Sequence, residues 1–129
     1  MKELVFLAIA GALGALSRYG LSCAAVRVLG SDFPYGTLIV NVIGCLLLGL
    51  LMHIGLTTDI IPQSLRLVLS VGFLGAFTTF STFSYETTRY IQDGAWLTVA
   101  GNIGANVILG ILATIAGLAI GQVIFGGSS

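Results

Sequence analysis

Thr78-Thr79-Phe80-Ser81-Thr82-Phe83-Ser84, near the middle of the third apolar segment, contains five Ser or Thr residues, two Phe residues and no aliphatic side chain. A helix that only had to dissolve in lipid would carry Leu, Ile and Val at these positions. Hydroxyl groups and ring edges crowded at membrane depth suggest a path for a small polar solute. This run therefore predicts both a special third helix and the place where function resides.

The rest of the chain has the composition of a membrane protein. Its 129 residues are 57% hydrophobic and 8% charged, where soluble domains are about 25% charged. The mean hydropathy is +1.07. Five basic and five acidic residues cancel, and no basic block indicates contact with nucleic acid. We expect one domain, residues 1–129, in the lipid bilayer.

Four apolar segments of about 20 residues or more are long enough to cross a bilayer. Their approximate spans are 4–28, 35–56, 64–90 and 95–125. The predicted fold class is an all-α membrane protein with four transmembrane helices, and its expected location is the cell inner (plasma) membrane as a multi-pass protein.

The third segment is not expected to be one uniform helix. Gly75, with Thr78 and Thr79 shortly after it, makes a stretch of weak helix formers. A break would free backbone carbonyls, which are typical cation ligands in discontinuous membrane helices. The alternative is a continuous helix in which the hydroxyls bond carbonyls four residues back. Spacing alone leaves both open.

Neutral groups in these segments can meet an anion. Phe80 and Phe83 are three residues apart and share a helix face. The edge of an aromatic ring is positive, so ring edges among hydroxyls can solvate an anion; ordinary packing is the alternative. Asn41, in the second segment, offers two N–H donors, and its alternative use is an interhelical hydrogen bond.

Other polar residues extend the predicted path. Asn102 and Asn106 lie one helical turn apart, and Gly110 follows one turn later, which makes a polar and small stripe on the fourth segment. Arg18 either extends to the interface or attracts anions in a vestibule. Glu86 either pairs with an arginine or caps the polar end of the third segment.

The charges at the helix ends give no orientation signal. Lys2 and Arg66 lie at one predicted end, and Arg27 and Arg89 lie at the other. Because such charges normally decide orientation, the chain is expected to insert both ways and pair as an antiparallel, dual-topology homodimer. The alternative is that weaker cues select one orientation.

The residue types exclude some functions and rank others. No His, Cys and carboxylate cluster, phosphate loop or nucleophile–base pair is present, so the chain is not expected to be an enzyme. A small dual-topology proton-coupled multidrug-type exporter is the competing transporter, but it needs an acid deep in the first helix, where this chain has Arg18. A non-transporting scaffold would leave the hydroxyl run and the Asn stripe unexplained.

Three stretches resemble the Fluc/CrcB fluoride channels. They are GFLGAFTTFSTFSYE at residues 72–86, YGTLIVN at 35–41 and GALSRY at 14–19. Their order and spacing, and the chain length, agree with the family across essentially the whole chain. The hydroxyl and phenylalanine run is the most specific part.

The resemblance implies a fluoride-selective passive channel that exports cytoplasmic fluoride down its electrochemical gradient. It implies an antiparallel homodimer with two pores and a central structural sodium ion, held by the backbone carbonyls of Gly75 and Thr78 from each chain. Phe80 and Phe83 would present their ring edges to fluoride, and Asn41 would be the pore-lining amide.

The resemblance also assigns the remaining polar residues. Ser81, Thr82 and Ser84 would supply hydroxyls near the pore or near the crossover of the third helices. Arg18 would lie near a vestibule and Glu86 near a pore end. The fourth segment departs from several members, which carry Tyr or His and then Ser where this chain has Asn102, Asn106 and Gly110. Because Asn also donates, Asn106 stays in the predicted pore, and the roles of Asn102 and Gly110 stay open.

Overall fold

The computed structural model describes residues 1–126, and that part of the chain contains helices and short connections without a strand. In chain order the elements are α1 (Lys2–Leu29), α2 (Tyr35–Thr57), α3 (Gln63–Leu67), the π-helix η1 (Val68–Leu74), α4 (Gly75–Phe77), α5 (Ser81–Gln92), α6 (Trp96–Gly104), the π-helix η2 (Ala105–Leu109) and α7 (Gly110–Phe125).

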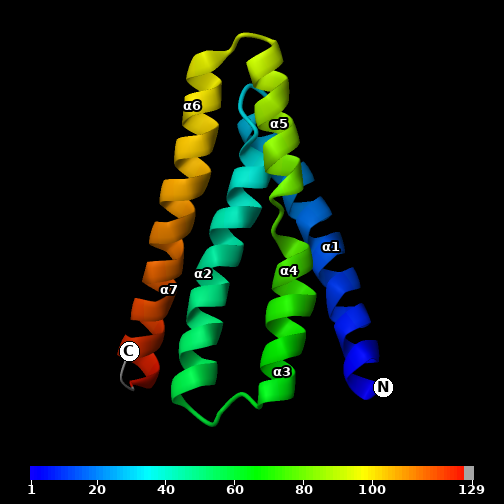
Figure 1. The fold of residues 1–129 in the computed structure, drawn as a ribbon, viewed down its shortest axis with the longest axis vertical. Helices are drawn as coiled ribbons and strands as arrows, with labels where there is room; N and C mark the ends of the chain where they lie inside the picture. The colour runs from blue at the N-terminus through cyan, green and yellow to red at the C-terminus, as the bar shows by residue number, and fades with distance from the viewer. Residues whose placement is uncertain (127–129) are drawn as a thin grey trace.

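These elements form four passes that are each long and apolar enough to cross a membrane: Lys2–Leu29, Tyr35–Thr57, Gln63–Gln92 and Trp96–Phe125. The passes alternate in direction, and both ends of the described chain lie at the same end of the bundle (Figure 1). The predicted all-α membrane fold with four transmembrane helices is confirmed, and the chain is a multi-pass membrane protein. The antiparallel homodimer stays a prediction.

Glycines bring the passes into close contact. A Cβ on Gly117 of α7 would collide with the Leu46 carbonyl oxygen of α2, and a Cβ on Gly49 of α2 would collide with the Thr114 carbonyl oxygen of α7. Gly14 of α1 lies equally close to the Phe73 carbonyl oxygen. Small residues allow this approach in membranes, where packing rather than hydrophobicity drives helix association.

The third pass is broken, which is one of the two alternatives that the spacing left open. α4 ends at Phe77, its C-cap residue Thr78 has an extended backbone at φ −90° and ψ 163°, and α5 begins at Ser81. The thin link between α4 and α5 marks this break (Figure 1). Thr78 Oγ1 donates to the Leu74 carbonyl at 3.0 Å, and Thr79 Oγ1 accepts from the Thr82 N–H at 3.1 Å, as an N-cap does.

The two interpretations of this segment are therefore both partly right. The Thr78 hydroxyl bonds the carbonyl four residues back and ends one helix, whereas the Thr79 hydroxyl starts the next helix. A threonine hydroxyl can end the first helix and another can start the second because the backbone between the two helices is extended. The π-helix η1 immediately before the break was not predicted from the sequence.

Candidate functional site

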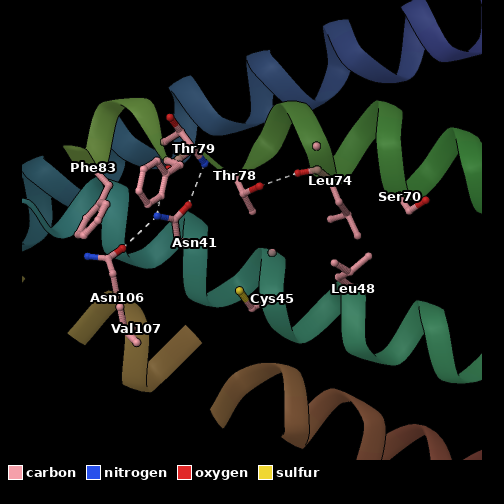
Figure 2. Close-up of a pocket in the computed structure, with 13 residues that line it drawn as sticks. Asn41, Cys45, Leu48, Ser70, Leu74, Thr78, Thr79, Phe83, Asn106 and Val107 are labelled. Atoms are coloured by element: carbon pink, nitrogen blue, oxygen red, sulfur yellow. Dashed lines mark hydrogen bonds between the residues drawn. The ribbon is translucent and has the colours of Figure 1, made fainter. Parts of the chain in front are cut away.

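Asn41 of α2 holds the extended backbone of the break. Its Nδ2 donates to the Thr79 carbonyl at 3.1 Å, and its Oδ1 accepts from the Thr79 N–H at 2.9 Å (Figure 2). A side-chain amide thus supplies hydrogen bonds to both backbone groups of Thr79, the residue after the extended Thr78. Exposed backbone groups at membrane depth are costly, so this pair of bonds stabilises the break.

A chain of hydrogen bonds continues from Asn41 to α6 and α5. Asn41 Nδ2 also donates to Asn106 Oδ1 at 3.0 Å, and Asn106 Nδ2 donates to the Asn102 carbonyl at 2.9 Å and to Asn102 Oδ1 at 3.0 Å. Asn102 Nδ2 donates to Thr87 Oγ1 at 2.9 Å, and Thr87 Oγ1 donates to the Phe83 carbonyl at 2.8 Å. Asn102 has no exposed surface.

The two phenylalanines of the run lie together. The ring centroids of Phe80 and Phe83 are 5.5 Å apart, and the ring planes are inclined at 55°. Phe83 is 9% exposed, whereas Phe80 is 77% exposed on the single chain. One ring is therefore fixed inside the bundle beside Asn41, and the other covers its outer side, where lipid or another chain must meet it.

A cavity of about 330 Å³ lies against the break. Its lining comes from α2, the third pass and η2, and Figure 2 shows the labelled side chains around it. Of the predicted site residues, the cavity brings together Asn41, Gly75, Thr78, Phe80, Phe83 and Asn106. It also includes Thr79, Ser70 and Cys45, which the sequence analysis did not assign to the site.

Other predicted site residues lie elsewhere. Ser81 and Ser84 are exposed on α5 and are absent from the lining of this cavity. Gly110 is buried on α7 opposite Cys45, where an added Cβ would lie 3.6 Å from the Cys45 sulfur. This is an ordinary contact distance, so Gly110 lies against α2 with room for a methyl group.

A second, smaller cavity of about 210 Å³ lies on the other side of the break and contains Arg18, Glu86 and Thr82. Thr79 lines both cavities, so the break separates them. Arg18 Nε donates to the Ala76 carbonyl at 3.0 Å and so caps the end of α4. Among the described residues, Glu86 Oε1 is buried and has no hydrogen-bond partner.

The backbone at the break keeps free acceptors. Within residues 1–126, no donor reaches the carbonyl oxygens of Gly75 or Thr78, because the nearby N–H groups of Thr78 and Thr79 are bound elsewhere. The described part of the chain holds no group of three or more His, Cys, Asp or Glu side chains that fits a metal ion. Backbone oxygens of this kind suit hard cations.

Thr87 is a further polar residue that sequence reasoning missed. It is buried on α5 and accepts the hydrogen bond from Asn102. Its position four residues after Phe83 places both on one helix face, and that spacing is the signal that could have found it.

The larger cavity of the site is lined by no charged side chain. Most of its lining is apolar, with a few amide and hydroxyl groups and two aromatic rings, and the charged Arg18 and Glu86 lie beyond the break. Such groups can replace the hydration shell of a small ion without trapping it.

Comparison with known proteins gives a consistent result. Residues 5–118 match the family described as CrcB-like protein, Camphor Resistance (CrcB). A protein of Dehalococcoides mccartyi named fluoride-specific ion channel FluC is 52% identical over 124 residues, which cover 96% of this chain and 95% of that protein. Proteins with the same name from Geobacter metallireducens and Solidesulfovibrio magneticus are 49% identical over 118 residues and 46% identical over 124 residues. These matches cover 92% and 96% of this chain, and 95% and 99% of those proteins.

Proposed function

The chain belongs to the CrcB (Fluc) family, and from that premise we propose that it is a fluoride-selective passive channel of the plasma membrane. It lets cytoplasmic fluoride leave the cell down its electrochemical gradient and so confers fluoride resistance. The observation that carries the proposal is the cavity at the helix break, where Asn41, Phe83 and Phe80 gather in a lining without a charged side chain.

The chemistry of this lining suits fluoride. Fluoride is small and strongly hydrated, so a pore must replace its water with other donors. Asn41 can donate one N–H to the anion in place of Asn106 Oδ1. The tilted rings of Phe80 and Phe83 can present their positive edges to it. Thr82 offers a hydroxyl in the smaller cavity, beside Arg18 and Glu86 at the pore end.

We propose an antiparallel homodimer with two such pores. Phe80 is largely exposed on one chain, and Ser81 and Ser84 are exposed on the same helix. A second copy against this surface would cover the ring and bring the hydroxyls to a pore wall. The balanced charges, Lys2 and Arg66 at one end and Arg27 and Arg89 at the other, favour two copies in opposite orientations.

A structural sodium ion at the centre of this dimer also fits the residues present. The carbonyl oxygens of Gly75 and Thr78 accept no hydrogen bond within the described chain, and they would hold the ion together with the same pair from the other copy. The bound ion would balance the partial negative charge of these oxygens. It is not needed at the neighbouring Ala76 carbonyl, which accepts a hydrogen bond from Arg18.

Fluoride efflux from liposomes tests the proposal. Purified protein is reconstituted with potassium fluoride inside, valinomycin is added, and a fluoride electrode follows the external concentration; a parallel sample holds potassium chloride. We expect fast fluoride release, no chloride release, and loss of fluoride release in Phe80→Ile and Phe83→Ile. A folded wild-type protein that releases no fluoride contradicts the proposal.

The unpartnered oxygen of Glu86 is the one observation that favours the proton-coupled exporter. The variant Glu86→Gln separates the two functions in the same assay, because it keeps the shape and removes the titrating group. A channel retains fluoride efflux in this variant. An exporter that depends on proton exchange at Glu86 loses its transport.

A further inference from the structure

The hydrogen-bond chain ends at two buried residues with no assigned role, Asn102 and Thr87. We propose that they are positioning residues, which fix the direction of the whole amide chain and keep Asn106 from becoming a second anion donor beside Asn41. The inference rests on the proposed channel function and adds to it a device that limits how tightly the pore holds fluoride.

At one end of the hydrogen-bond chain, Thr87 fixes the direction of Asn102. The Phe83 carbonyl can only accept, so the Thr87 hydroxyl must donate to it. The Thr87 oxygen then accepts from its other neighbour, and that neighbour is the Asn102 amide nitrogen at 2.9 Å. With its nitrogen committed to Thr87, Asn102 must turn its oxygen towards Asn106.

The same logic passes through Asn106 to Asn41. The Asn106 nitrogen donates twice to Asn102, to the backbone carbonyl and to the side-chain oxygen, so its own oxygen faces the Asn41 nitrogen. At the far end the Thr79 backbone fixes Asn41 independently, because its N–H and carbonyl cannot exchange places. No amide in the chain can turn over alone without setting oxygen against oxygen or N–H against N–H.

This direction matters to an anion. In the observed direction of the hydrogen-bond chain, the Asn106 side-chain oxygen accepts from Asn41. Only the Asn41 N–H can then donate to fluoride instead. If Asn102 and Asn106 both turned over, two amide nitrogens would converge and bind an anion between them. Conduction needs binding that is weak enough for the ion to leave. Asn102 has no exposed surface, so water cannot satisfy it in other orientations.

The chain offers a matched pair of variants. Thr87 and Thr88 both donate to the carbonyl four residues back, at 2.8 Å and 2.9 Å, but only Thr87 also accepts an asparagine amide. Thr87→Val keeps the shape of the side chain and removes the hydroxyl that sets the direction. Thr88→Val removes an equivalent hydroxyl from the exposed side of the same helix, and Thr87→Ser keeps the hydroxyl.

In the liposome assay, Thr87→Val is expected to lower both the maximal fluoride efflux and the half-saturating fluoride concentration, each by about three- to tenfold, as for one hydrogen bond. Thr88→Val and Thr87→Ser should behave as the wild type does. A purely structural role lowers the maximal efflux without lowering the half-saturating concentration, and that result overturns the inference. Equal behaviour of Thr87→Val and Thr88→Val also overturns it.

A second measurement reads the amide directions without fluoride. The chain has three asparagines, Asn41, Asn102 and Asn106, and all three are in the hydrogen-bond chain. In protein labelled with ¹⁵N-asparagine, the side-chain NH₂ signals of Asn102 and Asn106 should shift in Thr87→Val and stay in place in Thr88→Val. Unshifted signals overturn the inference, whereas a wild type that carries no fluoride overturns the channel function.

Discussion

Asn41 is the residue in which the fold and the proposed conduction meet. One of its N–H groups and its oxygen pair with the Thr79 backbone and hold the break, and the other N–H points to an acceptor that fluoride can replace. An amide can do both jobs because it carries a donor pair and an acceptor on one planar group. A carboxylate of the same shape keeps only the acceptor for the Thr79 N–H and loses both donors.

The variant Asn41→Asp tests the two donors of this amide together. It keeps an oxygen for the Thr79 N–H, removes both donors and adds a negative charge to the cavity. We expect fluoride efflux to fall about ten- to hundredfold, the range for losing a hydrogen bond to a charged group. The control is Gln63→Glu, the same chemical change at the exposed start of α3. Normal efflux from a folded Asn41→Asp channel would contradict the role of Asn41.

At the scale of residues, the sequence alone identifies those site residues whose side chains differ in kind from their apolar neighbours. Asn41, Phe80 and Phe83 lie in the predicted site because a carboxamide and paired rings stand out among aliphatic residues. Thr87 did not stand out, since hydroxyl residues in membrane helices usually bond their own backbone. It does so here too, and its second bond, to Asn102, depends on a distant helix.

At the scale of elements, the break in the third pass was predictable and its surroundings were not. Weak helix formers and hydroxyls marked residues 78–80, where the helix does stop. The π-helices η1 and η2 left no comparable mark, because a shift in backbone hydrogen-bond register requires no particular residue type. The capping of α4 by Arg18 likewise depends on the path of α1 beside it.

The close contact of α2 and α7 gives a prediction at this scale. A Cβ at Gly117 would meet backbone atoms of Leu46 and Leu50, which cannot move aside as a side chain can. Gly117→Ala is expected to destabilise the folded protein by about 1–3 kcal/mol, as overpacking does. Thermal unfolding in detergent measures the change.

The matched control for this prediction is Gly104→Ala. That glycine lies in α6 with no atom within 4 Å of the added Cβ. Its variant should be as stable as the wild type or more so, because Ala favours a helix over Gly by about 1 kcal/mol. Equal unfolding temperatures for Gly117→Ala and the wild type would show that the α2 and α7 contact is looser than described.

At the scale of the whole molecule, one chain leaves the site half covered. The cavity at the break opens beside Phe80, whose ring is mostly exposed. The sequence indicated pairing through the balance of end charges, but it could not supply the partner surface, since exposed apolar residues serve lipid and protein contacts alike.

Dual insertion is testable on intact cells. A cysteine introduced at Ser64, near the exposed start of α3, should react with an impermeant thiol reagent in about half of the molecules, because both orientations are equally favoured. Permeabilised cells give the full reaction and serve as the reference. The two native cysteines are replaced by alanine in the background used. Labelling of all or none of the molecules in intact cells would contradict the antiparallel arrangement.

The central claim is passive, fluoride-selective conduction through the site at the break, and the reversal potential in a planar bilayer tests it most directly. Fluoride is set at different concentrations on the two sides, with chloride balanced to the opposite gradient and a pH gradient added in a second step. The account predicts reversal at the equilibrium potential of fluoride and no shift when the pH gradient is added. Reversal that follows chloride, or that moves with the proton gradient, would contradict it.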